Sequence, residues 1–351
     1  MAVSGETAIV RYDEQMKLSL FDGDAARHLG FAGGARPNPR SAGGAKRHRM
    51  HGPLFWACMI SFAGMTASAQ SHADFSGIWS SMTATPLERP AQLKDKAFFT
   101  KDEAAAFERR AAERTVERPG DNVGRNYNEV FYEPGTRLSK TLRTSIVVEP
   151  ADGRIPALTP AAAAVKKQKA EALKSPSGVK DVGLQDRCLA FEMAIPPMIP
   201  YRYNSNYQFL QTGDTLMIDA EMAHETRVIP LDGRAHASPD LRFWAGDSVG
   251  HWEGNTLVVD TTNYNDAGGF YGEAGGMFGW DRNLHVVERI SLMDPETLLY
   301  QFSVDDPTAF TKPWTGEFTM SRTGGQIYEY ACHEGNYSLP NLLKVLVVQG
   351  N

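Results

Sequence analysis

The chain has 351 residues, of which 42% are hydrophobic, and its formal net charge is −6. This length and apolar fraction allow one large domain with its own core. The negative charge argues against a nucleic-acid partner, because binding to a phosphate backbone needs a basic face. No run of apolar residues reaches the roughly 20 that a membrane-spanning helix requires, so we expect no stable membrane span.

Residues 50–69 have the pattern of a secretory signal peptide. A basic stretch runs into Met50, a short apolar run covers 53–65, and an A-x-A cleavage site ends at Ala69. A membrane anchor is the alternative, although the apolar run is too short for it. We therefore expect a periplasmic or secreted protein that is cleaved near Ala69. Residues 1–49 are predicted to be a non-structural leader upstream of the true start, and a genuine disordered leader is the alternative.

The rest of the chain, residues 70–351, is predicted to form a single β-rich domain with two helical insertions. The first helix is expected over 101–117, where Thr100 and Glu103 have the spacing of a capping box. The second is expected over 161–173, between two prolines.

Strand patterns dominate from residue 201 onward. Apolar and polar residues alternate over 216–228, which predicts one strand face with a mainly apolar character and places His224 on it. Close turns separate roughly ten short strands along the chain. The fold class is therefore mainly β, an antiparallel meander that closes into a lipocalin-like β-barrel or sandwich, because closure hides the strand edges. The Gly77-x-Trp79 motif also resembles the start of lipocalins.

Two cysteines, Cys188 and Cys332, lie in the predicted mature part of the chain. An even pair in an exported protein favours a disulfide. Two buried free thiols are the alternative.

Several segments between residues 187 and 337 together resemble a large family of exported bacterial proteins of unknown function. The two most distinctive are the stretch from Gly246 to Asn263, with the pattern GDSxGHWEGxTLVVDTTN, and YACHEGNY at 330–337. The resemblance is specific as a family label and implies no catalytic role.

Two side chains with apolar neighbours are the first candidates for acid–base chemistry. His224 suits it because an imidazole changes charge near neutral pH; a core histidine bonded to the backbone is the alternative. Glu288 alternates with apolar residues on its strand, and an inward carboxylate is costly unless it is paired. A structural ion pair with Arg227 or Arg289 is the alternative for Glu288.

Asp260 and His333 are the further catalytic candidates. We expect them at the rim of a cavity that holds His224 and Glu288, with the aromatic loop over 268–280 across its mouth. A strand-end residue bonded to a turn is the alternative for Asp260.

These candidates predict an exported enzyme of the isomerase, lyase or hydrolase class without an organic cofactor, which acts on a small hydrophobic molecule. A non-catalytic binding or carrier protein for such a molecule is the alternative. A divalent metal held by His224, His285 and His333 is a further alternative, although no H-x-H or H-E-x-x-H spacing supports it.

Overall fold

The computed structural model describes residues 72–93, 95–116, 131, 133, 135–174, 176–191, 195–266, 282–337, 339–341 and 343–344. The predicted leader and signal peptide lie outside the described residues, and so does the predicted loop over 268–280.

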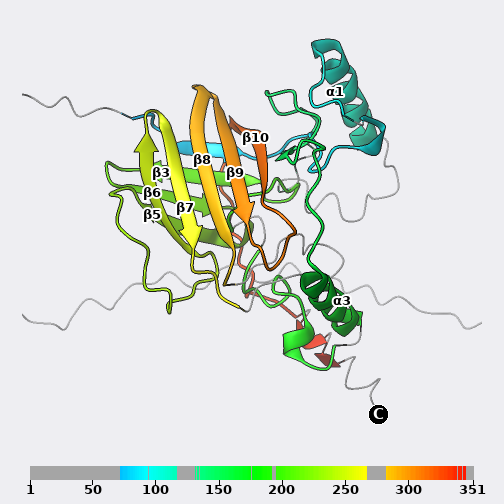
Figure 1. The fold of residues 1–351 in the computed structure, drawn as a ribbon, viewed down its shortest axis with the longest axis vertical. Helices are drawn as coiled ribbons and strands as arrows, with labels where there is room; N and C mark the ends of the chain where they lie inside the picture. Colours follow the sequence, from blue (N-terminus) through cyan, green and yellow to red (C-terminus); the bar gives the residue numbers. More distant parts are fainter. Residues whose placement is uncertain are drawn as a thin grey trace, which may run out of the picture. The chain divides into compact units, whose positions relative to one another are not determined.

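Ten strands form one sheet with a nearly closed barrel shape, which confirms the predicted fold class (Figure 1). The strands are β1 (Gly77–Ser80), β2 (Val147–Glu149), β3 (Asn206–Gln211), β4 (Thr215–Ala220), β5 (Glu225–Pro230), β6 (Asp247–Glu253), β7 (Thr256–Thr262), β8 (His285–Asp294), β9 (Thr297–Asp305) and β10 (Trp314–Arg322). Their order is β5-β4-β3-β1-β10-β9-β8-β7-β6, and β2 pairs with part of β10. Every neighbouring pair is antiparallel.

The seam of the nearly closed barrel lies between β5 and β6, the two end strands of the sheet. Because nine strands alternate in direction along the path, the first and the last run the same way. A connection between strands of the same direction must cross from one end of a sheet to the other, which explains the long segment over 231–246. Arg227 bridges the seam, since its Nη2 atom donates to Ser248 Oγ at 3.2 Å.

The Gly77-x-Trp79 motif has a packing role in this barrel. Trp79 is fully buried, and the Arg322 guanidinium lies 4.2 Å from its ring centroid. Gly77 has φ of +144°, and a Cβ atom there would lie 2.1 Å from Arg322 Nη1. Glycine is therefore needed so that the Arg322 side chain can cover the Trp79 ring.

The two predicted helices are present with nearly the expected bounds, as α1 (Lys101–Val116) and α3 (Pro160–Lys174). The capping box of α1 forms: the Thr100 amide donates to Glu103 Oε2 at 2.8 Å, and the Glu103 amide donates to Thr100 Oγ1 at 3.3 Å. Among the described residues, short 3-10 helices lie at η1 (Ala91–Leu93), η3 (Val179–Asp181) and η5 (Met222–His224). Within the described part of the chain, no helix has both the length and the apolar character to cross a membrane.

The single alternating strand predicted over 216–228 is wrong, because η5 divides it into β4 and β5. Ala223 and His224 have φ of 65° and 54° and turn the chain between the two strands. The alternation of faces restarts at Glu225, which shares the inward side of β5 with the buried Arg227. His224 is exposed instead of lying on an apolar face. A shift of one residue thus places the imidazole of His224 outside the barrel and turns the carboxylate of Glu225 towards the barrel.

Candidate functional site

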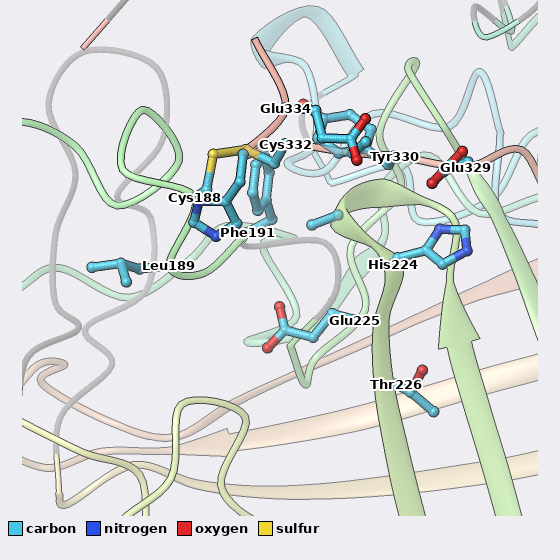
Figure 2. Close-up of a pocket in the computed structure, with 13 residues that line it drawn as sticks. Cys188, Leu189, Phe191, His224, Glu225, Thr226, Glu329, Tyr330, Cys332 and Glu334 are labelled. Atoms are coloured by element: carbon cyan, nitrogen blue, oxygen red, sulfur yellow. A yellow bond between two sulfur atoms is a disulfide. The ribbon is translucent and has the colours of Figure 1, made fainter. Parts of the chain in front are cut away.

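A pocket of about 530 Å³ opens at the end of the barrel where β5 begins (Figure 2). Its walls come from residues 188–191, from 223–226 and from 329–334. Phe191 is buried and Tyr330 is partly buried, whereas the two histidines of the pocket, His224 and His333, are exposed. The volume lies in the range that small-molecule sites occupy.

The predicted disulfide between Cys188 and Cys332 forms one side of this pocket, with a Cα–Cα distance of 5.8 Å. Further contacts hold the same C-terminal segment in place. The Tyr328 amide donates to Glu221 Oε1 at 3.2 Å, and Asn336 Nδ2 donates to the Asp186 carbonyl at 3.1 Å. The pocket therefore depends on a covalent link between segments that are 144 residues apart.

Glu225 is the carboxyl group of the pocket that is best suited to exchange a proton with a ligand. It is partly buried, and burial raises its pKa from 4.5 to about 7, although a hydrogen bond from the Phe191 amide and the charge of Arg227 oppose the shift. A carboxyl group that is half ionised near neutral pH serves as a proton donor and as a proton acceptor. Raised carboxyl pKa values inside a pocket are typical of functional sites.

Glu225 is not among the residues predicted from the sequence, because the alternation over 216–228 places it on the solvent face. The missing information was the turn at η5, which shifts the alternation by one residue. No local motif distinguishes Glu225 from the other glutamates of the chain.

His224 and Glu288 do not share a cavity, so that part of the predicted site is wrong. His224 is exposed at the barrel end, whereas Glu288 is fully buried inside the barrel. His333 and His224 do line the same pocket. Figure 2 shows the side chains of His224 and Glu225 leaving the chain on opposite sides of the turn.

Glu288 forms the ion pair with Arg227 that was its structural alternative. Arg227 Nη2 donates to Glu288 Oε2 at 2.6 Å, and Arg227 Nη1 donates to Glu288 Oε1 at 3.1 Å. The Tyr300 hydroxyl also donates to Glu288 Oε1, at 2.7 Å. Burial is the largest influence on the pKa of Arg227 and lowers it, but the charge of Glu288, the hydrogen bonds to Glu288 and the nearby Tyr300 and Tyr264 together outweigh burial and raise that pKa. The buried Glu288 carboxylate accepts these three hydrogen bonds, and the ion pair is the structural alternative expected for it.

Asp260 belongs to a chain of hydrogen bonds on the outer face of β6, β7 and β8. His236 Nδ1 lies 2.9 Å from Asp247 Oδ2, and His236 Nε2 lies 2.9 Å from Asp260 Oδ1. His285 Nε2 lies 2.9 Å from the other Asp260 oxygen. Both His236 contacts are hydrogen bonds to carboxylates only when both ring nitrogens carry a proton. Through His236, this cluster fastens the 231–246 segment to the barrel.

The cluster corrects two expectations. Asp260 does not lie at the rim of a cavity shared with His224; it bonds to a connecting segment, which was its structural alternative. The metal set of His224, His285 and His333 is not assembled, since His285 bonds to Asp260 and does not line the pocket of the other two. In the described ranges, no three His, Cys, Asp or Glu side chains are grouped so as to hold a metal ion.

The Asp260–His285 contact predicts a pH-dependent contribution to stability. The hydrogen bond between them lowers the pKa of Asp260 and raises that of His285. The His285 contribution is complete below the ordinary value of 6.5 and is lost as pH rises through the raised pKa. The Asp260 contribution is complete above 3.8 and is lost as pH falls through the lowered pKa.

His285→Ala is therefore expected to reduce the free energy of unfolding most between those two pH values. The side chains are 41% and 36% exposed, so solvent screening limits the loss to about 0.5–1 kcal/mol. Urea unfolding from pH 3 to pH 9 measures it, with His333→Ala as the control at an exposed histidine. A loss that does not vary with pH would contradict this assignment.

Comparison with protein-family models, with curated proteins and with solved structures found no match to this chain. The resemblance to the family of exported proteins therefore stays a prediction.

Proposed function

We propose that this protein is an exported enzyme that performs acid–base chemistry on a small molecule in the pocket beside the disulfide. Glu225 would take the central role as proton acceptor and donor, in place of His224 and Glu288. The observation that carries the proposal is the partly buried Glu225 carboxyl group in the wall of an open pocket of about 530 Å³.

The chemistry follows from the position of Glu225. With a pKa of about 7, the ionised form accepts a proton from a bound molecule and the acid form returns it to another atom. That cycle suits an isomerase or a lyase, and it suits a hydrolase in which Glu225 activates water. The disulfide accords with an oxidising compartment, as the predicted signal peptide requires.

A non-catalytic carrier is the second candidate, and one observation favours it. Among the described residues that line the pocket, no histidine is hydrogen-bonded to a carboxylate. An isolated polar group can anchor a ligand without any turnover.

Glu225→Gln separates the two functions. Conversion would be followed by NMR on a panel of small amines, alcohols and esters with the purified protein. If Glu225 is the general base, we expect kcat for the substrate found to fall about 10²–10⁴-fold in the variant. The inflection near pH 7 in the wild-type pH–rate profile should disappear as well.

Glu296→Gln is the matched control, because it removes one carboxylate from the exposed turn between β8 and β9 at the opposite end of the barrel. It should keep the wild-type rate. Full turnover by Glu225→Gln would show that Glu225 is not the base, and binding of a molecule without any conversion would favour the carrier.

A further inference from the structure

The lining of the Glu225 pocket has a one-sided charge. Three glutamates face it, Glu225 from the wall and Glu329 and Glu334 from exposed positions. Among the described residues that line it, none is a lysine or an arginine. Arg227 lies close enough to lower the pKa of Glu225, but its guanidinium is bound to Glu288 inside the barrel. A pocket of this charge repels anions and concentrates cations.

The apolar part of the lining suits the body of an organic cation. The Phe191 and Tyr330 rings meet edge to face, with their centroids 5.5 Å apart, and Leu189 lies beside them in the wall. Aromatic faces attract ammonium groups, and more strongly where water is excluded. Because Phe191 is 6% exposed, the partly buried Tyr330 offers the larger apolar area to a ligand.

We infer that the molecule bound in this pocket is a small organic amine, with its ammonium group at Glu225 and its apolar body against Phe191 and Tyr330. The inference rests on the proposed function and names its substrate class. It adds a positive charge to the small hydrophobic molecule expected from the sequence, because the strand shift at η5 brings a carboxylate to the pocket.

The other titratable groups that line the pocket bear on the pH at which the interaction is measured. They are Glu329, Glu334, His224, His333 and Tyr330. Burial raises the pKa of Tyr330, so its hydroxyl stays neutral. At pH 6 Glu225 is mainly protonated and must release its proton to pair with an ammonium ion, whereas at pH 8 it is mainly ionised.

The test compares three molecules with the same aromatic body: 2-phenylethylamine, 2-phenylethanol and phenylacetate. Isothermal titration calorimetry on the oxidised protein at pH 8 is expected to show the amine binding at least about tenfold more tightly than the alcohol. Phenylacetate should bind most weakly. At pH 6, titrations in two buffers of different ionisation enthalpy should show release of about one proton per amine bound.

Two variants of Glu225 test whether its carboxylate causes the preference for the amine and the release of a proton. Glu225→Gln should remove both the preference for the amine and the proton release, while Glu225→Asp, which keeps the charge, should retain the preference. Glu296→Gln should behave as the wild type. Equal affinities for amine and alcohol in the wild-type protein, or an amine preference that survives Glu225→Gln, would overturn the inference.

The binding experiment and the test of catalysis can fail independently. If the amine binds selectively and is never converted, the ligand class is correct and the enzymatic proposal fails. If Glu225 is needed to convert a neutral molecule that binds as well as the amine, the enzymatic proposal is correct and the amine class is wrong.

Discussion

Glu288→Gln is expected to lower the free energy of unfolding by about 3–5 kcal/mol, because it leaves the Arg227 charge uncompensated inside the barrel. The two side chains are 0% and 3% exposed, so water cannot replace the lost partner. Guanidinium chloride unfolding at pH 7 measures the effect.

Replacing both partners should cost much less than replacing one. In the double variant Arg227→Met/Glu288→Leu no charge stays buried, and we expect a stability within about 2 kcal/mol of the wild type. Arg289→Met is the matched surface control, since Arg289 lies next to Glu288 on β8 and pairs with Glu253 in solvent; it should cost less than about 1 kcal/mol. A single-variant cost as small as that of the control would contradict the structural role of the pair.

Removal of the disulfide is the second large effect. The double variant Cys188→Ala/Cys332→Ala is expected to lose up to about 4–5 kcal/mol of unfolding free energy, because a long loop is no longer closed in the unfolded chain. The loop joins residues 144 apart. The segment 328–337 would then be held by non-covalent contacts such as the Tyr328–Glu221 hydrogen bond, so amine binding should weaken too.

Reduction provides an internal control for this variant. Dithiothreitol should destabilise the wild-type protein by a similar amount and leave the double variant unchanged. Equal midpoints of unfolding for the wild type with and without the reductant would show that the cross-link adds no stability.

The barrel could be predicted from the sequence because its signals are local. Buried residues alternate with more exposed ones over most of β8 and β9, as expected for strands with one face on the core. The Gly77-x-Trp79 motif indicated the first strand of the barrel, and the pair of cysteines indicated the disulfide.

The site could not be predicted in the same way, because it depends on one irregular turn and on contacts far apart in the chain. The three residues of η5 shift the alternation of the following strand by one residue and so reverse which of its side chains face inward. The alternation expected from the sequence therefore gave His224 the inward position that Glu225 holds. His236 lies in a segment without regular alternation, and nothing near it in the sequence points to Asp247 and Asp260. The partner of Glu288 was within reach of sequence reasoning, and Arg227 was named as one of two alternatives.

The central claim, that Glu225 is a proton-exchanging group in the pocket, is tested most directly by its own titration. Carbon-13 NMR of glutamate carboxyl signals from pH 3 to pH 9, with Glu225→Gln to assign the resonance, measures its pKa in the folded protein. We predict a value of about 7, caused by burial in the pocket wall. A Glu225 carboxyl that titrates at the ordinary glutamate value of 4.5 would contradict the account.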